Sequence, residues 1–563
     1  MCSGTGSTAV SSTAGRRGSG RHAVLLSALL ILGGMVPLTV LAVARQAPAD
    51  PLFVPGDQCM ACHNGLTTAT GEDVSIGLDW RGAMMANAAR DPYWQAAVRR
   101  EIMDHPESRA AIEDKCSTCH MPMARFEAKS QGGAGQVFVH LPIGSGTAPM
   151  SLLAADGVSC LACHQIQPVG LGRPESFTGG FVMHTPSRLA FGPFDVRPGP
   201  ARIMRSATGF LPAGSAHVQS SELCGSCHVL YTHSLGPGGK VTGELPEQTP
   251  YLEWLHSDHA REERSCQSCH MPVVPGSMAV SSVMGTLREG FSRHVFRGGN
   301  FFMPKLLNLH RAELGVAALP QELELVSKRT AEHLSTSAAA MTVPRAEVAD
   351  GRLEAEVMVV NLAGHKLPTA YPSRRAWLRL TVRDAGGKPV FESGAPLPTG
   401  AIAGNDNDAD PLAYEPHYRT ITDPGQVQIY ESVMAGPDGT VTTGLLTAVR
   451  YVKDNRLLPR GFDKAGADED VAVYGPAVED PDFEGGGDRV LYRVPVGEAR
   501  GPFTVEAELW YQPIAFRWAR NLAAYDAPET RRFALWYDAL AGSSAIRLAR
   551  AEARTGGAGA PGF

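Results

Sequence analysis

Five copies of one short motif constrain this chain more than any other feature. In each copy two residues separate a pair of cysteines, and a histidine directly follows the second cysteine. The copies are Cys59-Met-Ala-Cys62-His63, Cys116-Ser-Thr-Cys119-His120, Cys160-Leu-Ala-Cys163-His164, Cys224-Gly-Ser-Cys227-His228 and Cys266-Gln-Ser-Cys269-His270. Of the 11 cysteines, only Cys2 lies outside these copies. One chemical purpose must therefore account for nearly all the cysteine in the chain.

This spacing suits the covalent attachment of haem. Two thiols that enclose two residues can add to the two vinyl groups of one haem, and the adjacent histidine can then bind the iron. Isolated Cys-x-x-Cys pairs could instead form disulfides, redox dithiols or half zinc sites. Five repetitions with histidine always in the same place favour five haem c groups. Thioether bonds are then expected at all ten motif cysteines, with iron ligands at His63, His120, His164, His228 and His270.

The amino end predicts export. Residues 1–22 carry Arg16, Arg17 and Arg21 but no acidic residue, and residues 23–43 form an apolar run. A basic flank followed by an apolar stretch is typical of a secretory signal, although a run of about 20 residues could also remain as a membrane anchor. In both cases the chain after residue 44 is expected outside the cytoplasm, in the periplasm, on the outer face of the cytoplasmic membrane or at the cell surface.

Composition excludes several other classes of protein. Apolar residues make up 44% and charged residues 19% of the 563, with a net charge of −6. A polytopic membrane protein, a disordered chain and a basic nucleic-acid-binding protein are all inconsistent with these values.

The pattern along the chain predicts two domains. The motif-bearing part is rich in Gly and Pro, with short helical patches such as 91–103, which indicates a mainly helical and irregular fold around porphyrin. Alternating runs separated by turn residues then indicate an all-β, sandwich-like domain, with strands at 353–360, 376–382, 427–433, 489–494 and 503–511. The predicted division is a leader or anchor over 1–44, a pentahaem domain over 45–310, a helical connector over 311–343 with a helix at 321–340, a β-domain over 344–525, and a closing helix at 530–551 with a disordered tail within 526–563.

Several longer stretches extend the pattern beyond the motifs. They are Trp80-Arg-Gly-Ala-Met-Met-Ala-Asn87, Arg90-Asp-Pro92, Asp156-Gly-Val-Ser-Cys160, Cys266-Gln-Ser-Cys-His-Met-Pro272, His294-Val-Phe-Arg-Gly-Gly-Asn300, Asn361-Leu-Ala-Gly-His-Lys-Leu-Pro-Thr369 and Tyr451-Val-Lys-Asp-Asn-Arg-Leu-Leu-Pro459. Through them the chain resembles the exported multihaem c-type cytochromes, a superfamily of tetrahaem electron carriers, pentahaem nitrite reductases and octahaem hydroxylamine oxidoreductases. The resemblance implies a pentahaem member with a carboxyl-terminal β-domain.

The second axial ligand of each iron decides what such a protein can do. An iron with two protein ligands can only carry electrons, whereas an open iron can bind a substrate. His294, beside Gly298 and Gly299, and His365, in a turn with Gly364 and Pro368, are the first candidates. The others are His184, His217 and Met85, which is expected on a helix and whose thioether would raise the potential of its haem. Surface or hydrogen-bonded roles are expected for His105, His140, His310, His333 and His417.

One further loop suggests a cation. Residues 404–410 read Gly-Asn-Asp-Asn-Asp-Ala-Asp and could hold calcium, although the full loop pattern and its bidentate acid are missing. A solvated turn is the preferred interpretation.

Two functions follow from this sequence. The first is an electron relay through five haems between redox partner proteins in the membrane or periplasm, with no nucleic-acid partner and with membrane contact only through residues 23–43. The alternative is a haem oxidoreductase that acts on a small nitrogen or sulfur compound at one open iron. The related pentahaem nitrite reductases carry lysine in place of one motif histidine, and all five motifs here end in histidine, which counts against that reaction.

Overall fold

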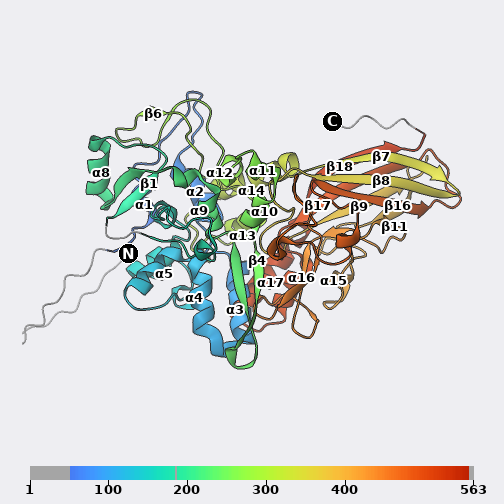
Figure 1. Cartoon of the computed structure of the whole chain (residues 1–563), viewed down its shortest axis with the longest axis horizontal. Helices are drawn as coiled ribbons and strands as arrows, with labels where there is room; N and C mark the ends of the chain where they lie inside the picture. The colour runs from blue at the N-terminus through green and yellow to red at the C-terminus, as the bar shows by residue number, and fades with distance from the viewer. Residues whose placement is uncertain (1–50, 184–186, 557–563) are drawn as a thin grey trace, which may run out of the picture. The chain divides into compact units, whose positions relative to one another are not determined.

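The motif-bearing part of the chain folds into short helices joined by long loops (Figure 1). The structure, a computed structural model, describes residues 51–183 and 187–556. Its helices up to residue 310 are α1 (Gly56–Met60), α2 (Ile76–Gly82), α3 (Pro92–Asp104), α4 (Arg109–His120), α5 (Pro122–Ser130), α6 (Pro149–Ala155), α7 (Cys160–His164), α8 (Pro198–Thr208), α9 (Ser221–Gly225), α10 (Pro250–Leu255), α11 (Asp258–Arg261), α12 (Cys266–His270) and α13 (Met303–Leu309). The predicted leader, with its apolar run 23–43, and His184 lie outside the described residues.

Helix α3 shows how local chemistry sets these elements. Asp91 precedes the helix, and its carboxylate accepts hydrogen bonds from the backbone N–H groups of Tyr93 and Trp94 at 2.8 and 3.2 Å. Pro92 occupies the first turn, where no N–H is needed. The helix therefore begins within one residue of the predicted position.

Strands in this region form only small two-stranded pairs. Their members are β1 (Leu189–Gly192) with β2 (Leu211–Gly214), β3 (Leu230–Leu235) with β4 (Val241–Gln248), and β5 (Met278–Ala279) with β6 (Leu287–Arg288). Across residues 51–183 and 187–556, no helix is both long enough and apolar enough to cross a membrane.

The rest of the chain contains two larger sheets (Figure 1). One has the order β11-β16-β8-β7, and the other has the order β10-β9-β17-β18 with β12 also paired to β9. A third sheet joins β14, β13 and β15. The strand bounds are β7 (Ala339–Ala349), β8 (Arg352–Asn361), β9 (Arg375–Arg383), β10 (Pro389–Ser393), β11 (Thr420–Ile421), β12 (Ile429–Tyr430), β13 (Ser432–Ala435), β14 (Val441–Thr442), β15 (Arg450–Asp454), β16 (Gly487–Pro495), β17 (Thr504–Gln512) and β18 (Ile546–Arg554).

Buried side chains alternate along these strands and meet in one core. Leu353, Ala355 and Val357 of β8 belong to the same buried cluster as Val505 and Ala507 of β17. The apolar faces of both large sheets therefore contribute to one hydrophobic interior.

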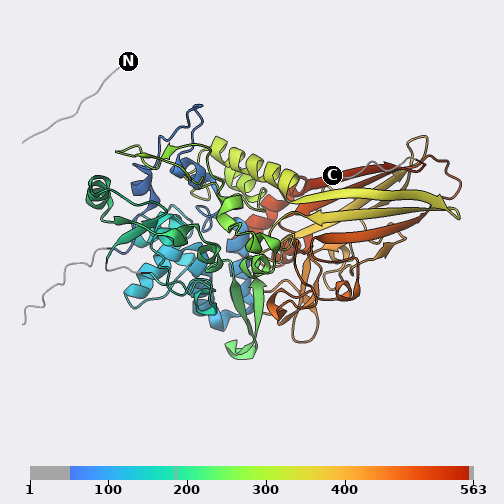
Figure 2. The same cartoon turned by 45° about the horizontal axis from the view of Figure 1, so that its top comes forward.

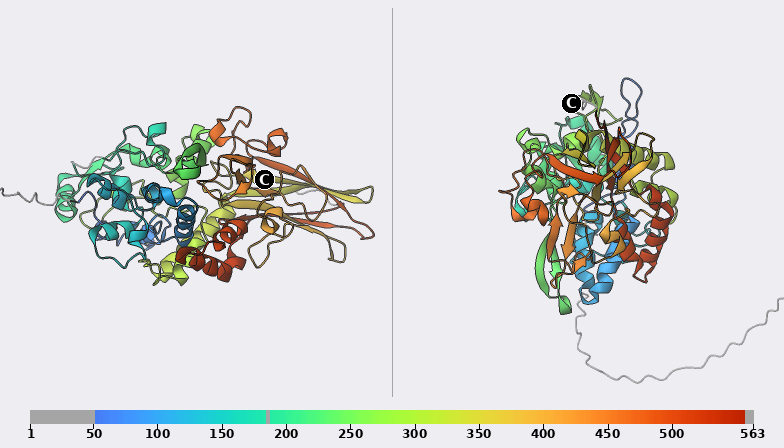
Figure 3. Two further views of the ribbon diagram at one scale, coloured as in Figure 1. Left: turned by 90° about the horizontal axis from the view of Figure 1, so that it is seen from below. Right: turned by 90° about the vertical axis from the view of Figure 1, so that its right-hand side faces the viewer.

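This core continues into the motif-bearing region. Tyr93 of α3 and Phe302 beside α13 belong to the same buried cluster as the strands. Figure 3 shows the red helices near the carboxyl end beside the blue α3, where Arg99 and Glu529 form an ion pair at 2.9 Å. The β-region is thus packed directly onto the motif-bearing region, and residues from Pro51 onward form one compact unit.

Helices in the carboxyl half depart from the predicted positions at two places. The helix predicted at 321–340 is α14 (Pro320–Ser337), which runs into β7 before the predicted domain boundary (Figure 2). The helix predicted at 530–551 is wrong in its second half, because α17 (Pro528–Leu540) is followed by strand β18. Ala and Arg in β18 favour helix by intrinsic propensity, but pairing with β17 overrides that preference. The remaining helices are α15 (Asp406–Ala409) and α16 (Phe516–Ala523).

Candidate functional site

The five motifs occupy equivalent local structures. Helices α7 and α12 consist of the third and fifth motifs, and α4 ends with the second. The first motif begins at the end of α1, and the fourth begins at the end of α9. One helical turn therefore brings each histidine and its two cysteines to the same side of the backbone.

Backbone hydrogen bonds orient four of the motif histidines. Nδ1 of His63 donates to the carbonyl of Val280 at 2.6 Å, and Nδ1 of His120 donates to that of Ala88 at 2.9 Å. His164 and His270 donate in the same way, to the carbonyls of Phe191 and Arg297. A ring whose Nδ1 carries the proton presents Nε2 as an unprotonated nitrogen, which is the form that binds a metal.

The fourth motif histidine is accessible and yet partly desolvated. His228 is exposed by its accessible area, yet burial lowers its pKa to about 4, with further lowering by His270 and Arg374. A ring at a convex surface would not be desolvated in this way. The ring is therefore accessible while protein atoms surround it closely enough to disfavour its charged form.

Two further histidines lie near motif histidines, with their rings almost parallel. The ring centroids of His164 and His294 are 6.4 Å apart, with planes 22° from parallel. Those of His270 and His365 are 6.3 Å apart, with planes 15° from parallel. Nδ1 of His294 donates to Ser292 and Nδ1 of His365 donates to Lys366, so Nε2 is the remaining nitrogen in both.

These separations fit one metal ion between each pair. A metal–imidazole bond is about 2 Å and a ring nitrogen lies about 1.1 Å from its centroid, so two imidazoles on one iron should have centroids about 6.2 Å apart. Near-parallel aromatic pairs in this protein range from 3.6 Å between His310 and Trp536 to 6.2 Å between Trp377 and Trp510, so the unprotonated Nε2 atoms add to the argument from distance. The residues present therefore fit haem iron with two histidine ligands.

Burial keeps these rings neutral. It lowers the pKa of His294 to about 3 and that of His365 to about 4, and it lowers the pKa of His164 and His270 as well. A neutral imidazole retains the lone pair that a metal needs.

Thiols from different motifs lie next to one another. The thiol of Cys59 is hydrogen-bonded to that of Cys160, and this contact is the main reason that the pKa of Cys59 is raised. Cys119 pairs with Cys227 in the same way, and Cys224 pairs with Cys266. None of the ten motif cysteines forms a disulfide. The first motif is thus adjacent to the third, and the fourth is adjacent to both the second and the fifth.

This clustering does not make a zinc site. A zinc ion needs several ligand atoms that converge on one point. Among the residues that the structure describes, only His417, Asp480 and Asp488 bring three potential ligand atoms within 4.8 Å of one another. No motif residue belongs to that group, so the half-zinc-site alternative finds no support in the geometry.

Hydrogen bonds around His417 also argue against a metal bound by His417, Asp480 and Asp488. Nδ1 of His417 accepts hydrogen bonds from the side-chain amides of Gln428 and Asn455, at 2.9 and 3.1 Å. The proton must then lie on Nε2, which donates to Asp480 at 3.0 Å. A ligating Nε2 would require loss of that proton and an imidazolate ring. The expected hydrogen-bonded role of His417 is therefore what the structure contains.

The weaker candidates for axial ligands behave differently. His217 uses both nitrogens in hydrogen bonds, with Ser215 at 2.7 Å and Ile166 at 2.8 Å, and offers none to an iron. Met85 lies in a turn after α2, so the helix expected there is absent. Its carbonyl accepts a hydrogen bond from Val158, two residues before the third motif.

The remaining histidines have other neighbours. His105 lies 3.5 Å from the hydroxyl of Thr447, and Nδ1 of His140 lies 3.4 Å from that of Ser151. His333 has its pKa lowered to about 4 by burial and by the nearby Arg297, His270 and His365. It therefore lies close to the fifth motif without being paired in the manner of His365.

Ion pairing occupies the oxygen-rich loop 404–410. Both carboxylate oxygens of Asp408 bind the guanidinium of Arg375, at 2.8 and 3.0 Å. Asn405 caps the short helix α15 by accepting from the N–H of Asn407. These oxygens are used within the protein, which favours the turn interpretation over calcium.

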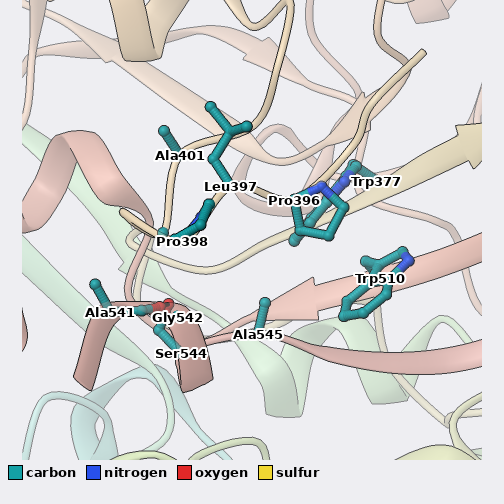
Figure 4. A pocket seen from close by; sticks show the side chains of 11 residues that line it. Trp377, Pro396, Leu397, Pro398, Ala401, Trp510, Ala541, Gly542, Ser544 and Ala545 are labelled. Atoms are coloured by element: carbon teal, nitrogen blue, oxygen red, sulfur yellow. Dashed lines mark hydrogen bonds between the residues drawn. The ribbon is translucent and has the colours of Figure 1, made fainter. Parts of the chain in front are cut away.

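One surface pocket has no role in this chemistry. It lies in the β-region, has a volume of about 300 Å³, and is lined by Trp377, Trp510, prolines and small residues (Figure 4). No titratable side chain lines it.

Sequence reasoning missed the buried charges that support His365. Glu253 of α10 accepts hydrogen bonds from Arg456 at 2.8 Å, from the backbone N–H of Lys366 at 3.1 Å and from Thr369. Asp454 in turn binds Lys366 at 2.8 Å and Arg456 at 2.7 Å. Lys366 and Arg456 lie within the stretches 361–369 and 451–459 that carry the family resemblance. The sequence therefore singled out both cations, but nothing in it marked Glu253 on α10 as their partner.

Comparison with known proteins agrees with this geometry at the level of the fold. The structure of a penta-heme cytochrome c552 from Thermochromatium tepidum matches with a TM-score of 0.51 over 90% of this chain and all of that chain. The fold is similar to that of a multihaem cytochrome. Sequence identity to this penta-haem cytochrome is 16%. No protein-family model matches the chain, and no curated protein matches it.

Proposed function

We propose that this chain is an exported multihaem c-type cytochrome that binds five haems through its motif cysteines and relays electrons between redox proteins. The observation that carries the proposal is the pair of facing histidines at His164–His294 and His270–His365, at the separation that one iron requires. Two protein ligands on one iron leave no position for substrate, which suits electron transfer.

The chain's own residues would hold each group in a fixed position. The two thiols of a motif would form thioethers, and the motif histidine would bind from one side with its Nδ1–H donated to a backbone carbonyl. That second hydrogen bond fixes the ring and raises the basicity of Nε2. Bound haem iron would supply one-electron chemistry by cycling between its ferric and ferrous states.

The contacts between thiols support a continuous relay. Cys59 with Cys160, Cys119 with Cys227, and Cys224 with Cys266 join motifs that are distant in the sequence. The charge of Cys163 also acts on Cys224, which brings the third motif near the fourth. All five attachment sites therefore form one connected group, with the first and fifth motifs at its two ends and the second as a branch at the fourth.

In this proposal the β-region completes the relay, because it supplies His365. The turn 361–369 lies between β8 and β9, and Asn361 donates to the carbonyl of His365 at 2.8 Å. The buried charges of Glu253, Arg456 and Asp454 attach the same turn to α10. A ligand for the fifth motif thus comes from the region that contains no cysteine.

The basic and apolar amino end supports export, as does the attachment chemistry. We place the mature protein outside the cytoplasm, in the periplasm or on the outer membrane face, with redox proteins as partners.

A second function is favoured by the fourth motif. Among residues 51–183 and 187–556, no ring pair comparable to His164–His294 is found for His63, His120 or His228. Of these three, His228 is the one whose pKa is lowered by a nearby arginine, Arg374. An open iron beside a cation would suit a small anion, so a reductase or oxidase of a small nitrogen or sulfur compound is the competing proposal.

Electron paramagnetic resonance of the oxidised protein separates the two functions. The relay predicts low-spin iron only, and addition of nitrite or hydroxylamine should leave the spectrum unchanged. A high-spin signal that shifts with either compound would favour the enzyme.

A further inference from the structure

An arginine-rich surface covers one end of the motif-bearing region. Between residues 187 and 218 the chain has four arginines and one acidic residue, Asp195. Helix α8 in this stretch buries none of its residues. Arg197, Arg202 and Arg205 on and beside α8 are exposed and form no ion pair, whereas most other exposed arginines of the described chain lie near carboxylates.

Apolar side chains from a neighbouring hairpin complete this surface. Met284 is 62% exposed and Leu287 is 73% exposed, both in the hairpin that includes β5 and β6. The hairpin contacts the α8 segment, because Arg288 lies over the ring of Phe194 at 5.2 Å and the methyl of Met284 lies beside Gly199. We call Arg197, Arg202, Arg205, Met284 and Leu287 the α8 surface.

This surface lies directly over the first motif. Helix α8 packs against α1, which leads into that motif (Figure 1). Ser282, two residues before Met284, donates from its backbone N–H and its hydroxyl to the carbonyl of Cys62, at 2.9 and 3.0 Å. Val280 accepts the Nδ1 hydrogen bond of His63. A protein bound to the α8 surface would therefore lie close in space to Cys62 and His63 of the first motif.

From this placement we infer that the α8 surface is the docking site of an acidic electron-transfer protein, which exchanges electrons with the group held by the first motif. The inference rests on the proposed electron relay and adds its terminus and partner class. Exposed arginines without carboxylate partners attract a negative surface and raise its rate of encounter. Exposed apolar side chains beside exposed arginines have the composition of a transient protein interface. The chain as a whole carries a net charge of −6, so this positive surface differs in sign from the protein's overall charge.

Stopped-flow reduction by flavodoxin hydroquinone, a small acidic one-electron donor, tests the inference. Each transfer oxidises the flavin to its semiquinone and reduces one ferric haem, which is followed by haem absorbance. For the wild type the second-order rate constant should fall about tenfold as salt rises from about 10 mM to about 500 mM, because screening weakens opposite charges. The variant R197E/R202E/R205E should react about 10- to 100-fold more slowly at low salt and lose this dependence.

The matched control is R352E/K388E/R500E, which reverses three exposed basic residues of the β-region that also lack ion pairs. It changes net charge equally and should stay within about twofold of wild type. Equal slowing of both variants, or a wild-type rate that does not fall with salt, would overturn the docking site.

Two further measurements distinguish a failure of the proposed electron relay from a failure of the proposed docking site. A haemochrome assay and full reduction by dithionite on every variant test the relay itself, so a deficit there counts against the proposed function rather than the surface. Co-sedimentation with vesicles of anionic phospholipid tests a membrane as the occupant. Vesicle binding that is lost in R197E/R202E/R205E, with an unchanged flavodoxin rate, would contradict the protein partner.

Discussion

Replacing Glu253 with glutamine should loosen the turn that carries His365. The Glu253 carboxylate is fully buried and accepts from Arg456, from the N–H of Lys366 and from Thr369. Burial alone would raise the pKa of Asp454, but the charges of Arg456 and Lys366 lower it to about 2, so Asp454 is ionised beside these two side chains. E253Q removes one charge from this group with almost no change in shape.

The size of the effect follows from the contacts. Removing one partner of a buried ion pair costs about 3–5 kcal/mol. Because Asp454 still binds Arg456 in the variant, we expect the lower end, about 3 kcal/mol of unfolding free energy. That energy corresponds to a factor of about 150 in an equilibrium constant. If this loss of stability falls on the turn 361–369, His365 should be detached from the iron of the fifth motif in a measurable fraction of the molecules.

Denaturant unfolding and electron paramagnetic resonance together test this prediction. E253Q should unfold at lower guanidinium concentration and show a new high-spin signal for up to one haem. The control is D538N, which breaks the exposed pair with Arg520 and should cost at most about 0.5 kcal/mol with no new signal. An E253Q protein with wild-type stability and only low-spin iron would refute the positioning role of this network.

Three other outcomes are expected. H294A should convert one haem to high spin whereas H217A should not, and an unchanged H294A spectrum would remove that ligand. Burial raises the pKa of Asp488 to about 7, so this carboxyl binds its proton more tightly in the folded protein. Between about pH 4 and about pH 7, the stability of the wild type should therefore fall relative to that of D488N by about 1.4 kcal/mol per pH unit. A difference in unfolding free energy that does not change with pH would contradict this. Because Asp408 is paired with Arg375, calcium added after chelation should leave the thermal midpoint unchanged, and a clear rise would restore the calcium interpretation.

Sequence patterns predicted local structure well wherever one residue type dominated it. The helix predicted at 91–103 and the alternating strands β8 and β16 are all features of short range. The helix predicted at 530–551 is wrong over β18, because the Ala and Arg content of this segment favours helix locally, whereas its pairing with β17 depends on a segment about forty residues away.

Long-range contacts explain what the sequence could not provide. The spacing of motifs along the chain gives no sign that Cys59 lies beside Cys160 rather than Cys119. Glu253 also has no local pattern that marks it as the partner of Arg456. Both relations arise only when distant helices and turns pack together, and no helical or strand period records them.

Counting haems on the purified, exported protein tests the central claim most directly. A pyridine haemochrome assay, combined with intact mass under denaturing conditions, should find five covalently attached haems per chain. A colourless protein, zinc in place of iron, or fewer than five attached haems would contradict the account.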